Sequence, residues 1–161
     1  MTYRITGLDP ARFAGLIQAD DEELARHGAI RMIVDHKPGF PCRVSLTDAE
    51  PGESVLLLQH VSHDVETPFR SAFAIYVREQ ARAAAVYEDR LPSVFSHRTM
   101  TLRGYDSRAM LRESLLAPPG DADSRIRALF ADPQIAYIHT HYAAPGCFAA
   151  MVERSEGDEH A

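Results

Sequence analysis

Two histidines and a cysteine near the end of the chain have residue types and a spacing suited to one chemical site. His139 and His141 stand two residues apart in an apolar segment, and Cys147 follows a Pro-Gly turn signal. Alternate side chains of a strand point to the same face, so both imidazoles are expected on one face. If residues 142–146 form the turn of a hairpin, His141 pairs with Cys147, and paired side chains also share a face.

This group supports two kinds of chemistry. Imidazole nitrogen and thiolate sulfur are usual ligands of Zn²⁺, so His139, His141 and Cys147 are candidate metal ligands. Histidine has an ordinary pKa of about 6.5 and can transfer protons near neutral pH, so His139 and His141 are also candidate catalytic residues. The structural alternative is that both imidazoles hydrogen-bond to backbone or to a carboxylate beside the core. A fourth zinc ligand would come from one of three earlier residues: Cys42, His60 or His63.

Cys42 lies between Pro41 and Arg43, and two interpretations are open. A cationic neighbour is typical of reactive cysteines, which makes Cys42 a candidate catalytic nucleophile or redox thiol. If Cys147 lies beside it, the two sulfurs could form a reversible disulfide. The alternative is that Cys42 is simply a small buried hydrophobic residue.

Three arginines form a second candidate group. Arg43 follows a rigid loop, Arg70 follows Pro-Phe, and Arg78 ends an apolar segment. An arginine at such a position can present its planar fork to a carboxylate or phosphate. If the three converge near the two histidines, they would form an anion-selective, ligand-binding pocket. The alternative is that each one pairs with a neighbouring acid, for example Arg43 with Asp48 and Arg78 with Glu79.

The elements that must position these residues begin with about three helices. An Asp before Pro is typical of a helix start, and a Gly is typical of a helix exit. Ile126, Leu129 and Phe130 have the spacing of one helical face. The predicted starts and ends are Asp9-Pro10 for the first helix, Asp20 and Gly28 for the second, and Asp121 or Asp123 and Asp132-Pro133 for the third.

Apolar runs and alternation predict the strands. The run at 55–58 is continuous, which is typical of a strand buried on both faces. Residues 59–69 are expected to be a polar loop, and 79–96 are ambiguous, with helix favoured over 81–85. The predicted strands lie at 1–7, 29–34, 55–58, 73–77, 98–105 and 109–116, with a final hairpin over 134–153.

This order of elements predicts an α+β fold. Strands and helices do not alternate strictly, so the sheet is expected to be mainly antiparallel, with a C-terminal β-hairpin. A chain of 161 residues has the length of one domain. The predicted organisation is a single α+β domain over residues 1–154, followed by a flexible polar tail over 155–161.

Composition excludes several functional classes. The net charge of −6 argues against binding to nucleic acid or to an anionic membrane surface, because both need a positive patch. No apolar stretch reaches the length of a membrane span, and the N-terminus lacks the apolar core of a signal peptide, so a cytoplasmic protein is expected. Glycine-rich phosphate loops and the GxSxG elbow of serine hydrolases are missing from the sequence.

Several separated motifs resemble one family. They are Pro38-Gly39-Phe40-Pro41-Cys42-Arg43, Pro51-Gly52-Glu53, Pro68-Phe69-Arg70, Ile75-Tyr76-Val77-Arg78-Glu79, Tyr137-Ile138-His139-Thr140-His141 and Pro145-Gly146-Cys147-Phe148. In this order they resemble the bacterial family known as domain of unknown function 1203. The resemblance covers most of residues 30–154 and implies a small bacterial cytosolic protein. It supplies no catalytic assignment.

Three functions are therefore weighed. The leading hypothesis is a domain that binds a small anionic molecule, without a cofactor, in a pocket formed by the 38–43 loop, Arg70, Arg78 and the 139–147 hairpin. The second is an enzyme that uses the histidines, with or without zinc. The third is a protein interaction module with no pocket chemistry. The sequence does not determine the oligomeric state.

Overall fold

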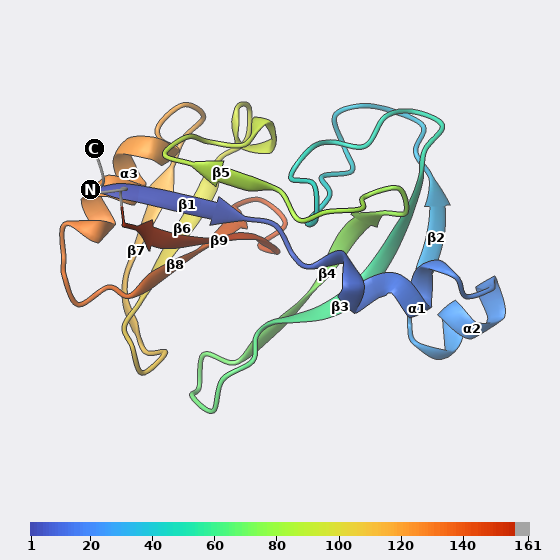
Figure 1. Ribbon diagram of the computed structural model, residues 1–161, viewed down its shortest axis with the longest axis horizontal. Helices are drawn as coiled ribbons and strands as arrows, with labels where there is room; N and C mark the ends of the chain where they lie inside the picture. Colours follow the sequence, from blue (N-terminus) through green and yellow to red (C-terminus); the bar gives the residue numbers. More distant parts are fainter. Residues whose placement is uncertain (157–161) are drawn as a thin grey trace.

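The computed structural model describes residues 1–156 and contains two antiparallel sheets that lie side by side (Figure 1). The larger sheet has the strand order β5-β1-β9-β8-β6-β7, and the smaller has the order β2-β3-β4. The larger sheet consists of β1 (Thr2–Thr6), β5 (Val86–Glu88), β6 (Met100–Tyr105), β7 (Leu111–Ala117), β8 (Tyr137–Tyr142) and β9 (Phe148–Ser155). The smaller consists of β2 (Ile30–Ile33), β3 (Ser54–His63) and β4 (Ser71–Arg78). The predicted α+β class, with mainly antiparallel sheets and a C-terminal hairpin, is confirmed.

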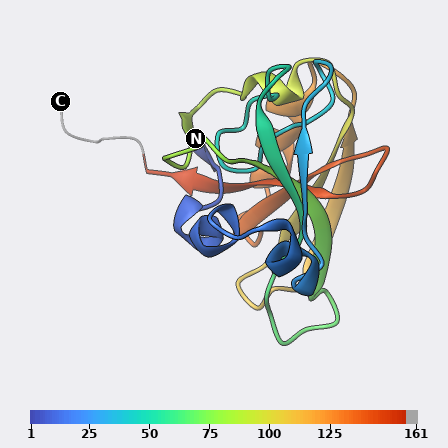
Figure 2. The same cartoon turned by 90° about the vertical axis from the view of Figure 1, so that its right-hand side faces the viewer.

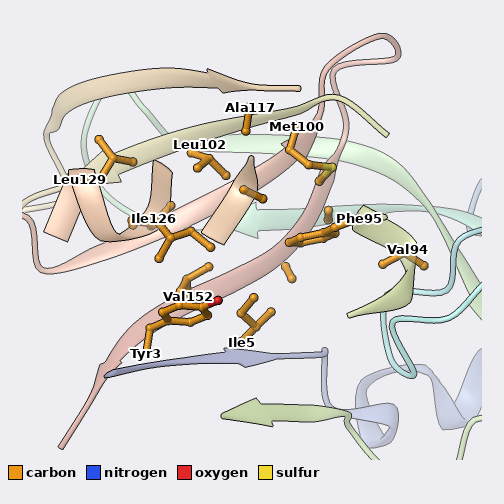
Figure 3. Close-up of a cluster of buried hydrophobic side chains, with 14 of the residues drawn as sticks. Tyr3, Ile5, Val94, Phe95, Met100, Leu102, Ala117, Ile126, Leu129 and Val152 are labelled. Atoms are coloured by element: carbon orange, nitrogen blue, oxygen red, sulfur yellow. The ribbon is translucent and has the colours of Figure 1, made fainter. Parts of the chain in front are cut away.

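One face of the larger sheet is covered by α3 (Ala122–Phe130) and by a 3-10 helix over Ser93–Phe95. Ile126, Leu129 and Phe130 are all buried, as their helical spacing predicts. Figure 3 shows Ile126 and Leu129 packed over side chains of the sheet, among them Leu102. Asp121 is the residue before the helix, but its side chain makes no capping hydrogen bond.

The smaller sheet packs against two short helices, α1 (Ala14–Ile17) and α2 (Asp21–Arg26), and Figure 2 views the molecule from this side. Both predicted caps are present. Asp9 Oδ1 accepts a hydrogen bond from the Ala11 amide at 3.0 Å, at the start of a 3-10 helix over Pro10–Phe13. Asp20 Oδ1 accepts one from the Glu23 amide at 2.8 Å. These caps satisfy amides that have no partner inside the helix.

Two predicted segments differ in the structure. The polar loop predicted at 59–69 is wrong for its first half, because β3 continues to His63 and pairs with β4. The last residue of the strand, His63, is buried against the larger sheet, a tertiary contact that no local pattern reveals. The helix favoured over 81–85 is also wrong, since these residues form neither helix nor strand. The backbone of Ala85 instead bonds to Val44 and Gly7.

The chain leaves the larger sheet at Gly7 and returns to it at Ala85. The Gly7 amide donates to the Ala85 carbonyl at 2.9 Å, and the Ala85 amide donates to the Val44 carbonyl at 2.9 Å. A Cβ atom on Gly7 would lie 2.1 Å from the Val44 oxygen, so this crossing requires glycine. The loop that carries Val44 is thereby held between the two sheets.

The two ends of the described chain complete the larger sheet. Ser155, where the predicted tail begins, is the last residue of β9 and pairs with Thr2 of β1. Most of that predicted tail, residues 157–161, lies outside the described residues. No helix in residues 1–156 is long and apolar enough to cross a membrane.

Candidate binding cleft between the two sheets

A cleft of about 740 Å³ lies where the loop after β2 meets the turn between β8 and β9. Cations and hydroxyl groups line one part, and the rest is apolar. Its lining residues are Gly39, Pro41, Arg43, Leu57, Phe73, Ala74, Tyr76, His97, Arg98, Thr99, Tyr142, Ala143, Ala144, Pro145 and Cys147. The cleft therefore takes residues from both sheets and from both connecting loops.

Arg43 is the central cation of the cleft, and only 1% of it is exposed. Its Nε donates to the Phe148 carbonyl at 2.8 Å and its Nη1 to the Pro41 carbonyl at 2.6 Å. Its Nη2 donates to the sulfur of Cys147 at 3.0 Å. No carboxylate of residues 1–156 forms a salt bridge with it. A buried guanidinium without a counter-charge carries a desolvation penalty of several kcal/mol, which carbonyl dipoles offset in part.

Tyr142 lies against two guanidinium groups. The Arg43 Cζ is 4.8 Å from the centre of its ring and the Arg98 Cζ is 5.4 Å from it, both at cation–π distance. The Tyr142 hydroxyl is buried and has no hydrogen-bond partner among the described residues. Burial raises the pKa of Tyr142 to about 12, so the group is a neutral phenol that can donate a hydrogen bond.

Arg98 differs from Arg43 because it has a counter-ion. Its Nη2 and Nη1 donate to the two carboxylate oxygens of Asp48 at 2.6 and 3.0 Å. Burial raises the pKa of Asp48, but the hydrogen bonds and charge of Arg98 outweigh burial and hold it below its ordinary value. Asp48 also lines a second, smaller cavity of about 480 Å³, and His97 lines both.

The three predicted arginines do not converge. Arg43 lines the cleft. Arg78 instead bonds to both carboxylate oxygens of Glu53 at 2.5 and 2.9 Å and lines the second cavity. Arg70 pairs with Asp64 at 3.2 Å in the exposed loop between β3 and β4. Arg70 and Arg78 thus each pair with an acid, as the alternative interpretation expects. The partners named for Arg43 and Arg78 are wrong, because Asp48 binds Arg98 and Arg78 binds Glu53.

The two histidines lie in a cluster that we call the aromatic interface. It joins β3 and β4 of the smaller sheet to the larger sheet and consists of His63, Phe73, Tyr105, Tyr137, His139, His141 and Phe148. The ring centres of His63 and His139 are 4.8 Å apart, and those of Phe73 and His141 are 5.1 Å apart. Neither His139 nor His141 lines the cleft.

Hydrogen bonds fix two of these imidazoles. His63 Nε2 lies 2.6 Å from the Tyr137 hydroxyl, and its Nδ1 lies 2.9 Å from the Phe69 carbonyl. A carbonyl can only accept, so Nδ1 carries a proton, and in the neutral ring Nε2 then accepts from the tyrosine. His141 Nδ1 donates in the same way to the Gly146 carbonyl at 3.0 Å.

Burial keeps the central histidines uncharged. It lowers the pKa of His139 to about 3, with His63, His141 and Arg103 adding repulsion. It also lowers the pKa of His141 to about 4, although the hydrogen bond to Gly146 acts in the opposite direction. Both rings are neutral near pH 7, which is the form that a buried site without a nearby carboxylate favours.

The predicted register of the hairpin is wrong. A bulge between Thr140 and His141 places His141 opposite Phe148, not Cys147. An extra residue on β9 shifts the pairing, as a β-bulge does. Cys147 therefore precedes the strand, and its sulfur lies at the guanidinium of Arg43. Among residues 1–156, no group of three or more His, Cys, Asp or Glu side chains is arranged to hold a metal ion.

The remaining candidate ligands also stand apart. Cys42 is completely buried, and its sulfur accepts from the backbone amides of Val44, Ser45 and Arg78 at 3.4, 3.5 and 3.3 Å. This geometry matches the small buried residue that was the alternative interpretation. His60 packs edge-on against Phe13, and burial lowers its pKa.

Sequence reasoning missed three residues of the cleft. The sequence predicts Arg98 only as the start of a strand, and no local pattern links it to Asp48, which lies fifty residues away. The predicted turn includes Tyr142, whereas Tyr142 is the last residue of β8. One signal was available: Tyr142 follows His141, so in a continuing strand it must face away from the histidines. His97 had no local signal.

The fold and the site together define a class: an α+β protein of two antiparallel sheets with a cation-lined cleft at their junction. The chain belongs to the family described as protein of unknown function (DUF1203), whose family model matches residues 39–154. Every residue that lines the cleft lies within this match. Neither the curated proteins nor the solved structures gave a match.

Proposed function

We propose that the cleft binds a small molecule that carries a carboxylate or phosphate group. The observation that carries this proposal is Arg43, a buried cation with no acidic partner in residues 1–156. Nη1 and Nη2 each use one N–H in the hydrogen bonds described above, which leaves one further N–H on each. An anion at this position supplies both the missing charge and two acceptors.

Tyr142 and the apolar wall support the same proposal. The unpartnered phenol can donate a third hydrogen bond to an anionic oxygen. Leu57, Phe73 and Pro145 form apolar lining for the rest of the ligand. Small-molecule sites are mostly apolar clefts of roughly 300–1,000 Å³ with a few polar groups, and this cleft falls within that range.

The first prediction concerns anion dependence. Thermal shift and calorimetry are run with inorganic phosphate, citrate and benzoate, and with benzamide as the uncharged counterpart of benzoate. We expect at least one anion to stabilise the protein in a concentration-dependent way, because a ligand that binds only the folded state raises its stability. Benzamide should not. If none of the anions shifts the unfolding temperature, the proposal is wrong.

The second prediction assigns the site. Tyr142→Phe removes only the hydroxyl and should weaken the binding of that anion about tenfold, the effect of one hydrogen bond. Arg70→Gln, at the exposed loop between β3 and β4, should leave the affinity unchanged. Equal affinities of the Tyr142 variant and the wild-type protein would place the anion elsewhere.

The proposal includes a bacterial, cytosolic location. Cys42 and Cys147 are both free thiols, which supports a reducing compartment.

A histidine-dependent enzyme is the second candidate, favoured by the 2.6 Å hydrogen bond between His63 and Tyr137. Elemental analysis of the purified protein tests its zinc-dependent form, for which about one equivalent of metal is expected.

A further inference from the structure

Cys147 is the one sulfur that lines the cleft. It is partly exposed, whereas Cys42 is completely buried. The turn before it holds it in place: the Gly146 amide donates to the Tyr142 carbonyl at 2.8 Å, and the Tyr142 amide donates to the Cys147 carbonyl at 3.0 Å. Gly146 has a φ of 79°, a conformation that glycine adopts readily and that allows this tight return.

The sulfur of Cys147 lies against a buried cation. Arg43 Nη2 donates to Sγ at 3.0 Å, and Arg43 has no carboxylate partner among the described residues. A guanidinium donor stabilises the negative charge that sulfur carries when it attacks. The other sulfur receives only backbone amides and has no route to solvent.

A second observation indicates that a ligand belongs beside the thiol. The Tyr142 hydroxyl has no partner, and Tyr142 is only 3% exposed. Buried polar groups are nearly always hydrogen-bonded, and no described residue takes up the hydrogen bond of this phenol, so the donor is free for a ligand bound in the cleft. Tyr142, Arg43 and Cys147 line the same cleft.

We propose that Cys147 undergoes thiol–disulfide exchange with a small anionic disulfide bound in this cleft. The sulfur of Cys147, having lost its proton to water, attacks one sulfur of the disulfide R–S–S–R. The Cys147–S–S–R bond forms, the original S–S bond breaks, and the electron pair leaves on the second sulfur as R–S⁻, which takes up a proton. Cys147 is oxidised and the leaving half is reduced, so no other oxidant is needed.

The inference rests on the proposed anion site, because the carboxylates of the disulfide would bind Arg43 and Tyr142. Oxidised glutathione, which carries carboxylates, is compared with cystamine, a cationic disulfide. Intact-mass spectrometry follows each reaction with the native protein and with the same chain in denaturant, where the net charge is the same but the cleft is absent. Peptide mapping identifies the modified sulfur.

We expect glutathione to be attached to Cys147 and not to Cys42. For each form of the chain, the extent of modification by oxidised glutathione is divided by the extent of modification by cystamine. This ratio should be about tenfold higher for the native chain than for the denatured chain. Cys42→Ser should retain this behaviour and Cys147→Ser should abolish it. Dithiothreitol should reverse the modification.

Two results would overturn the inference. One is a native Cys147 that stays unmodified while the denatured chain reacts completely. The other is the same preference between the two disulfides in the native and denatured chains. Calorimetry of Cys147→Ser with the anion that stabilises the wild-type protein keeps the two proposals distinct. If this anion still binds reversibly but the wild-type protein shows no selective exchange, the exchange inference is wrong and the anion-binding proposal stands.

Discussion

At the scale of single residues, Arg43 determines both the structure and the proposed chemistry of the cleft. Its fork joins three acceptors that come from two segments: the Pro41 carbonyl in one, and the Cys147 sulfur and the Phe148 carbonyl in the other. A planar guanidinium reaches all three at once because its donors point in fixed, divergent directions. One side chain therefore ties the loop after β2 to the start of β9.

Arg43→Lys tests this role. The charge is retained, but a single ammonium group on a flexible stem cannot replace three fixed donors, so buried acceptors lose their partners. We expect the free energy of unfolding in urea to fall by about 2–4 kcal/mol. Arg70→Lys, in an exposed ion pair, is the matched control and should change it by less than about 0.5 kcal/mol. Equal effects of the two substitutions would mean that the fork is not structural.

Residue-level reasoning could identify candidate groups but not their partners. Placing Arg43 beside a rigid loop near the final hairpin was possible from the sequence, because the Pro-Gly signals are local. Its neighbour Arg98 was not, because the Asp48 pairing depends on how two distant loops meet. The histidine–cysteine triangle failed through a single extra residue in β9, and a bulge leaves no reliable mark in the sequence.

At the scale of elements, the strand pattern was more predictable than the connections between sheets. The continuous apolar run at 55–58 lies in β3, the central strand of the smaller sheet, as its pattern predicts. The second half of β3 is polar and does not match a buried-strand pattern, and its last residue, His63, packs in the aromatic interface. The crossing of the chain at Gly7 likewise depends on a tertiary approach, to the Val44 carbonyl.

Gly7→Ala tests the close approach at this crossing. The added Cβ would lie 2.1 Å from the Val44 oxygen, so the backbone must move, and the hydrogen bond from the Gly7 amide to the Ala85 carbonyl must weaken. We expect the free energy of unfolding, measured in urea, to fall by about 2–4 kcal/mol. Gly15→Ala in α1 is the control, since no atom lies within 4 Å of the new Cβ, and it should stabilise by about 0.5–1 kcal/mol. If Gly7→Ala leaves the free energy of unfolding unchanged, the backbone at this crossing can move to accommodate a side chain.

At the scale of the whole molecule, neutral imidazoles are buried where the two sheets meet. The pKa values of His139 and His141 are about 3 and about 4 in the folded protein, below the unfolded value of about 6.5. As pH falls below 6.5, the unfolded chain binds protons that the folded chain does not. The stability of the folded state therefore falls with pH across this window.

Each of these two histidines should lower the free energy of unfolding at pH 5 by about 2 kcal/mol relative to pH 7. It is measured by urea unfolding between pH 7 and pH 5, above the range in which the paired carboxylates Asp48 and Glu53 become protonated. His139→Gln should reduce the loss by the contribution of that histidine, about 2 kcal/mol. A pH profile that is flat in the wild-type protein would contradict the burial of these rings.

The short link between Gly7 and Ala85 has a consequence for how this molecule is put together. Strands β1 and β5 are direct neighbours in the larger sheet, yet the whole smaller sheet and both of its helices lie between them in the sequence. The segment that contains the smaller sheet is thus an insertion, and a single hydrogen bond joins its two ends, Gly7 and Ala85. The cleft is therefore shared between the two parts: Arg43 belongs to the insertion, whereas Tyr142 and Cys147 belong to the larger sheet, and the Arg43 hydrogen bonds to Phe148 and Cys147 hold the parts together.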